Sequence, residues 1–269
     1  MREEQAASHQ GRGPVGAVAG GVGIGTLGGL IGLGGAEFRL PLLLGAFRFG
    51  PLEAVIVNKA MSLIVVASAL PFRTAAIPLT SIADNWIAVA NLLAGSLIGA
   101  WVGASWATRL RSQTFYRIIA ALLVVIAVVL VIGHGVEGGG PSLTGVSLAV
   151  TGVAAGFAIG VIASLMGVAG GELLIPTFIL LFGADVKLAG SLSLVVSLPT
   201  MLVGFARYAR DDTFQVLRRN RVFVLFMAAG SIVGTFVGAR LLGIVPDVIL
   251  LPALALILLI SAVKVWRHA

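Results

Sequence analysis

Two glutamates, Glu37 and Glu172, each follow a glycine-rich run inside an apolar part of the chain. The runs are Gly28–Gly35 and Ser164–Gly171. Ionisable residues within membrane-spanning segments are costly and usually functional, so this pair could carry a proton that is coupled to the movement of an anion. Alternatively, each carboxylate satisfies free backbone N–H groups at the start of a short helix. The residue pattern leaves both interpretations open.

A second polar group consists of Asn58, Lys59 and Ser62, whose counterparts 135 positions later are Ser193, Leu194 and Ser197. Asn58 and Ser62 are four positions apart and therefore share a helix face. Amide and hydroxyl donors suit the oxygens of a small oxyanion. For any single serine, the structural alternative is a hydrogen bond to its own helix or to a neighbouring one. Lys59 could contact an anionic substrate or extend to the cytoplasmic surface.

Arg39 stands between Phe38 and Leu40 in a short apolar segment. Its planar guanidinium would match two oxygens of an oxyanion. It could instead pair with Glu37 or Glu53, or reach the membrane interface.

These residues belong to a chain that repeats itself. Gly95–Ala104 returns 135 positions later as Gly230–Ala239, with six of ten residues identical. At the same offset, Gly32, Gly35, Glu37 and Pro41 match Gly167, Gly170, Glu172 and Pro176. In an apolar chain, internal repeats are typical of transporters whose binding site lies where the copies meet.

The composition indicates a membrane protein. Apolar residues make up 58% and charged residues 11%, and the mean hydropathy is +1.08. A soluble domain has about 25% charged residues. Backbone groups in the bilayer must be paired within a segment, and the alternating pattern of barrel strands is absent, so we expect helices.

Each half contains five apolar segments, and the second segment of each half is too short to cross alone. The expected segments are 15–33, 36–48, 54–72, 85–106 and 115–133, then 143–165, 172–183, 188–206, 221–242 and 247–264. We therefore predict an all-α polytopic membrane protein with two inverted repeats of about five segments, each containing one short, broken helix. Each short segment either crosses or forms a re-entrant hairpin with its predecessor.

Charge gives the expected orientation. Basic residues follow the fourth and eighth segments and end the chain, which by the positive-inside rule places these positions in the cytoplasm. The organisation is then a polar cytoplasmic leader (1–14), a first repeat (15–133), an extracytoplasmic linker (134–141) and a second repeat (142–269). Both termini would be cytoplasmic.

Other classes find little support. The chain has no cysteine, and His9, His134 and His268 lie in the leader, the linker and the tail, so neither a catalytic nor a metal site is expected. No P-loop is present for ATP-driven pumping, and no cofactor is expected. The net charge of +7 resides in loops and tails, so nucleic-acid binding is not expected.

Two decapeptides carry a family resemblance: Gly32-Leu-Gly-Gly-Ala-Glu-Phe-Arg-Leu-Pro41 and Gly167-Val-Ala-Gly-Gly-Glu-Leu-Leu-Ile-Pro176. A glycine run followed by apolar residues and a proline, once per half, resembles the TauE/SafE sulfite exporter family, also called the 4-toluene sulfonate uptake permease family. The resemblance extends from about Val15 to Val263. It implies movement of sulfite, thiosulfate, organosulfonates or related organic anions across the inner membrane of a bacterium.

The sequence therefore predicts a secondary transporter for a small sulfur-containing anion, with proton coupling as one option. An anion channel and a carrier of another organic anion or a divalent metal are the alternatives. Membrane lipid is an expected partner. Two glycine faces, formed by Gly95, Gly99 and Gly103 and by Gly230, Gly234 and Gly238, suit a homodimer as well as packing within one chain. The expected substrate-binding residues are Gly34, Gly35, Ala36, Glu37, Arg39, Asn58, Lys59, Ser62, Gly170, Gly171, Glu172, Ser193 and Ser197.

Overall fold

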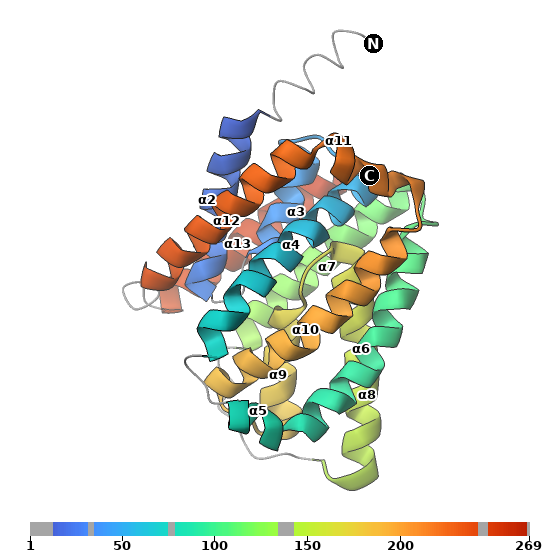
Figure 1. The fold of residues 1–269 in the computed structure, drawn as a ribbon, viewed down its shortest axis with the longest axis vertical. Coiled ribbons are helices and arrows are strands. Elements are labelled where there is room, and N and C mark those ends of the chain that lie inside the picture. Colours follow the sequence, from blue (N-terminus) through green and yellow to red (C-terminus); the bar gives the residue numbers. More distant parts are fainter. Residues whose placement is uncertain (1–12, 32–34, 75–78, 134–142, 242–246, 268–269) are drawn as a thin grey trace.

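The computed structural model describes residues 13–31, 35–74, 79–133, 143–241 and 247–267, and every regular element in these ranges is helical (Figure 1). The elements are α2 (Pro14–Ile31), α3 (Ala36–Gly45), α4 (Pro51–Thr74), α5 (Leu79–Asp84), α6 (Trp86–Ala107), α7 (Ser112–Gly133), α8 (Gly145–Met166), α9 (Gly171–Phe182), α10 (Val186–Tyr208), the 3-10 turn η1 (Asp212–Phe214), α11 (Gln215–Arg219), α12 (Arg221–Leu241) and α13 (Asp247–Trp266).

Five helices of the described chain are long and apolar enough to cross a membrane. They comprise Trp86–Ala107, Ser112–Val129, Gly145–Met166, Leu188–Tyr208 and Arg221–Gly238. The predicted helical membrane fold is thus confirmed, and segment boundaries agree within a few residues. The short helices α5 and α11 were not predicted, because six and five residues are too few to register as apolar segments.

The short helices α3 and α9 each fold back along the preceding helix. In the first copy, a Cβ at Gly20 of α2 would lie 3.1 Å from Leu42 Cδ2 of α3. Ile24, one turn later in α2, lines the same groove as Phe38, which lies one turn before Leu42 in α3. In the second copy, a Cβ at Gly152 of α8 would lie 3.2 Å from Phe182 Cζ, at the end of α9. Both pairs are therefore helical hairpins.

Helices of the two repeats pack against one another. The first helix of each repeat packs most extensively against the helix of the fourth apolar segment of the other, giving the pairs α2–α12 and α6–α8. Glycines permit this closeness, because a Cβ at Gly21 would overlap the carbonyl oxygen of Met227, and a Cβ at Gly99 that of Phe157. The glycine faces predicted from the sequence are therefore occupied inside one chain.

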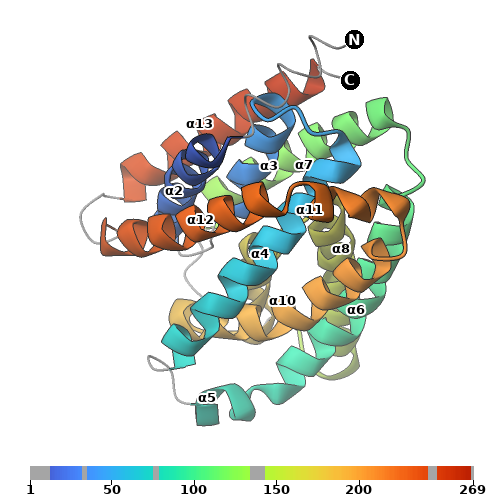
Figure 2. The ribbon, with the colours of Figure 1, turned by 45° about the horizontal axis from the view of Figure 1, so that its top comes forward.

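The helices gather into two bundles separated by α4, and the two views agree on this arrangement (Figures 1 and 2). α2, α3, α12 and α13 lie together on one side of α4, and α6, α8, α9 and α10 on the other. One apolar core includes residues of α2, α3, α12 and α13 and extends through α4 and α7 to the ends of α6 and α8, and a second joins α6, α8, α9 and α10. Each bundle contains helices from both repeats.

The ends of the molecule differ in the connections they carry. Figure 1 shows α5 at one end and α11 at the other. At the α11 end, the α3–α4 connection meets the start of α12 through the rings of Phe47 and Phe223, 4.8 Å apart. Nearby, Arg117 of α7 lies over the ring of Trp266 at the end of α13.

Candidate functional site

Glycines in the left-handed region mark where the hairpins turn. Gly35 (φ 71°) precedes α3 and Gly170 (φ 81°) precedes α9, while Gly167 (φ 68°) ends α8. Other residues adopt these angles only with strain, so the glycine pattern of the sequence is needed here. Both short helices begin inside the protein, where their first N–H groups have no partner within the helix itself. Gly34 lies outside the described residues.

Asn58 of α4 joins the two hairpins. Its side-chain amide Nδ2 donates to the carbonyl oxygen of Ala36, at the start of α3, over 2.9 Å. It also donates to the carbonyl oxygen of Met166, at the end of α8, over 3.1 Å. Both N–H bonds of one buried amide are thus used, one on each hairpin. Asn58 therefore fixes the two glycine breaks relative to each other.

Arg39 completes this arrangement from α3 and is fully buried. Its NH1 donates to Asn58 Oδ1 over 3.3 Å and to Ser62 Oγ over 3.2 Å. Ser62 in turn donates to the carbonyl oxygen of Asn58 over 2.8 Å, and that of Gly167 lies 3.4 Å away. Arg39 also lies within electrostatic range of Glu37. It does not extend to the interface, so that alternative is wrong.

Lys59 of α4 is fully buried and reaches the second hairpin instead of the cytoplasmic surface. Its ammonium Nζ lies 3.4 Å from both the carbonyl oxygen of Ala163 and Ser164 Oγ. These are long for hydrogen bonds, and both acceptors are neutral. Tyr208 donates to the carbonyl oxygen of the same Ser164 over 2.8 Å. The ammonium therefore lacks a strong acceptor among the groups that contact it.

Glu37 and Glu172 approach each other from the first turns of α3 and α9. Their side chains are only 1% and 7% exposed, and the carboxyl groups are close enough to interact directly. Among the described residues, Oε1 and Oε2 of Glu37 and Oε2 of Glu172 have no hydrogen-bond partner. Like charges repel strongly in such surroundings, so a proton or a cation between the carboxylates would stabilise the pair.

The serines of α10 are less engaged than their counterparts in α4. Ser193 donates over 2.8 Å to the carbonyl oxygen of Gly190, in its own helix, which is the structural alternative expected for such a serine. Ser197 is buried, and its Oγ has no partner in the described part of the chain. Gly171 is the first residue of α9. The cationic and amide groups of the network, Arg39, Lys59 and Asn58, therefore come from the first repeat.

Sequence reasoning missed the second repeat's contribution to this network. Met166, Ala163 and Ser164 supply carbonyl and hydroxyl oxygens at the end of α8, and Tyr208 supports Ser164 from α10. Carbonyl groups carry no signal of their own in a sequence. The sequence offered only Gly167, which ends α8 in a left-handed backbone conformation.

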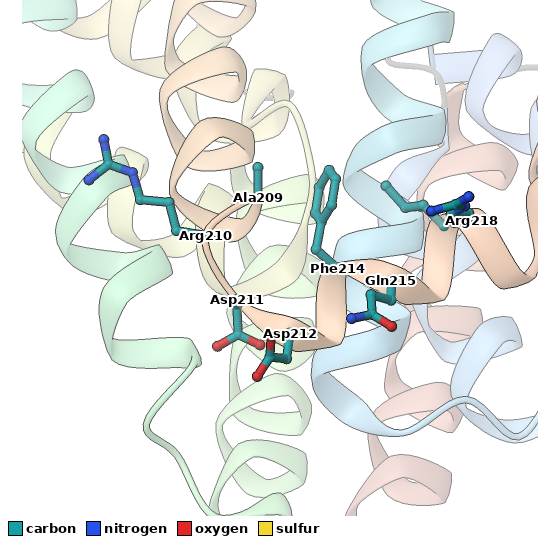
Figure 3. A pocket seen from close by; sticks show the side chains of 8 residues that line it. Ala209, Arg210, Asp211, Asp212, Phe214, Gln215 and Arg218 are labelled. Carbon is teal, nitrogen blue, oxygen red and sulfur yellow. The ribbon is translucent and has the colours of Figure 1, made fainter.

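A separate pocket lies on the surface at the α10–α11 connection (Figure 3). Figure 3 shows Arg210 and Arg218 on opposite sides of the carboxylates of Asp211 and Asp212. None of these residues belongs to the buried network, and their charges balance. We assign no function to this pocket.

Several apolar helices long enough to cross a membrane, with two helical hairpins that meet at buried polar groups, define a multi-pass membrane protein. Comparison with known families matches residues 17–265 to the sulfite exporter TauE/SafE family, and the chain belongs to that family. Membership implies a transporter of sulfite or another anion. No curated protein and no solved structure matches the chain.

Proposed function

We propose that this protein is a secondary transporter that moves a small sulfur-containing anion, such as sulfite, thiosulfate or an organosulfonate, with proton coupling. The observation that supports this proposal is that Asn58 bonds to both hairpins, with the buried cations Arg39 and Lys59 beside it. Free N–H groups at the start of a helix attract anions, and two such starts converge here.

In this proposal Lys59 supplies the attraction for the anion. A buried ammonium with only long contacts to neutral oxygens gains most from an acceptor that carries charge. The Arg39–Asn58–Ser62 group holds the two glycine breaks in place around the anion. Within the described residues, no group of three histidine, cysteine or acidic side chains could hold a metal ion. The anion is therefore the substrate that we favour.

Glu37 and Glu172 would carry the proton. One proton between the facing carboxylates relieves their repulsion, and release of that proton restores a negative charge beside the anion path. Binding and release of one proton with each anion would then couple the proton flux to the anion flux.

We propose that the moving bodies are the two bundles and not the two sequence halves. Helices α2 and α12 come from different repeats but pack backbone against backbone, as do α6 and α8. Such contacts resist sliding, since no flexible side chains separate the helices. The weaker boundary runs beside α4, whose Asn58, Lys59 and Ser62 make polar contacts with helices of both bundles.

We further propose that the repeats, 15–133 and 142–269, are inverted about an axis in the membrane plane. Support comes from the equivalent connections that contain α5 and α11, which lie at opposite ends (Figure 1). The α11 end carries most of the basic residues and would be cytoplasmic, together with the leader (1–14) and both termini. The linker (134–141), which lies outside the described residues, would be extracytoplasmic.

Labelling of single cysteines tests this orientation directly, because the chain has no native cysteine. Thr80→Cys in α5 and Arg218→Cys in α11 both replace exposed residues. An impermeant maleimide added to intact bacterial spheroplasts should label the first variant only. Inside-out vesicles should give the reverse result. Labelling of both variants from one side would refute the inverted arrangement.

Transport is tested in proteoliposomes with radiolabelled sulfite, thiosulfate, taurine and sulfoacetate, each with and without a pH gradient. We expect anion uptake that follows the proton gradient, and loss of that dependence in Glu37→Gln and Glu172→Gln. Glu53→Gln is the matched control, because Glu53 bonds to the backbone of Gly50 outside the network. Gradient-independent flux that survives both changes would refute proton coupling, and the rate of that flux would distinguish a channel from a carrier.

A further inference from the structure

We infer that the groove between α2, α3 and α13 binds one anionic phospholipid of the cytoplasmic leaflet. The groove encloses about 650 Å³, within the range of about 300–1,000 Å³ typical of ligand pockets. Its wall is apolar where Ile24, Phe38 and Leu42 face α13, and basic where Lys264 and Arg267 end that helix. An apolar trough with a cationic end has the polarity of a phospholipid.

The charge around the groove favours a negatively charged headgroup. Lys264 and Arg267 are exposed, and no acidic residue of the described chain lines the groove. A third cation stands beside them, because the Arg117 guanidinium lies 5.9 Å from the centroid of the Trp266 ring. Basic pockets between membrane helices on the cytoplasmic side bind anionic headgroups in this manner. Lipid phosphate would therefore lie between the two cations, with an acyl chain along α3.

This position gives the lipid a direct connection to the hairpin. One face of α3 lines the groove through Phe38 and Leu42, whereas Arg39 on the same helix binds Asn58 in the buried network. An occupied groove would brace α3 against α13. The inference relies on the proposed orientation but not on the proposed substrate.

Native mass spectrometry of the purified protein tests the site. The protein is titrated with phosphatidylglycerol or phosphatidylcholine that carry identical acyl chains. The wild type should retain one phosphatidylglycerol in preference to phosphatidylcholine. The Lys264→Gln/Arg267→Gln variant should lose about thirtyfold in phosphatidylglycerol affinity, since each basic residue near the headgroup contributes about 1 kcal/mol.

Two further variants separate a built site from diffuse attraction. Arg218→Gln/Arg219→Gln removes equal charge from α11, away from the groove, and should retain the preference. Gly45→Leu keeps every charge but fills the groove, and a Cβ at Gly45 meets no atom within 4 Å, so the fold should tolerate it. This variant should lose the bound lipid.

Equal retention of the two lipids by the wild type would overturn the inference. So would an equal loss of affinity in the α11 control, or unchanged binding in Gly45→Leu. Lipid retention is measured without substrate or gradient, so these outcomes are independent of the anion fluxes that test the proposed transport function.

Discussion

Replacement of Asn58 by leucine should separate the two hairpins while nearly preserving side-chain volume. The asparagine makes three buried hydrogen bonds: to the carbonyl oxygens of Ala36 and Met166, and from Arg39. Side-chain hydrogen bonds between membrane helices contribute about 0.6 kcal/mol each on average, and at most about 1.7. Loss of three should therefore cost about 2 kcal/mol of unfolding free energy. Because 1 kcal/mol corresponds to about 2–4 °C in a chain of this size, Tm should fall by about 4–8 °C.

Thermal unfolding of the purified protein in detergent measures this change through intrinsic fluorescence. Asn91→Leu is the matched control, because the Asn91 amide makes one hydrogen bond between helices, over 3.1 Å to the carbonyl oxygen of Ala149. That variant should lose only about 0.6 kcal/mol. Equal Tm values for the two variants would refute the conclusion that Asn58 holds the hairpins together.

Three further predictions concern packing and charge. Gly99→Ala should cost about 1–3 kcal/mol, because its Cβ would overlap the Phe157 carbonyl, whereas Gly23→Ala meets no neighbouring atom and should be neutral or stabilising in the same unfolding assay. Lys59→Met should match or exceed the wild type in Tm, since a buried charge with long contacts is removed, yet abolish anion uptake; full uptake would show that Lys59 does not serve the substrate. Phe223→Ala should lower the unfolding free energy by about 3 kcal/mol, since Phe223 is buried against two rings of the α3–α4 connection, and an unchanged Tm would contradict that packing.

The sequence by itself determined the class of fold, the family and the places where the helices break. Apolar length is a strong signal in a bilayer, because every backbone group must be paired within its own segment. The 135-residue offset paired Gly35 with Gly170 and Glu37 with Glu172, and both pairs lie at the starts of short helices. These features can be seen in single stretches of residues or by comparing two such stretches, without knowledge of how the helices pack.

Only the tertiary structure decided which of the polar residues meet. Lys59 could have extended to the surface, but it reaches Ser164, 105 positions away. Ser62 accepts a hydrogen bond from Arg39, whereas the Oγ of its counterpart Ser197 has no partner in the described chain. The position equivalent to Arg39 in the second repeat is Leu174, which has no group to donate. Such contacts depend on how helices from different repeats pack, and that packing follows from glycine surfaces and helix directions across the whole bundle. A repeat in the sequence therefore predicts equivalent backbones, but the chemistry of the site arises from contacts that the two copies do not share.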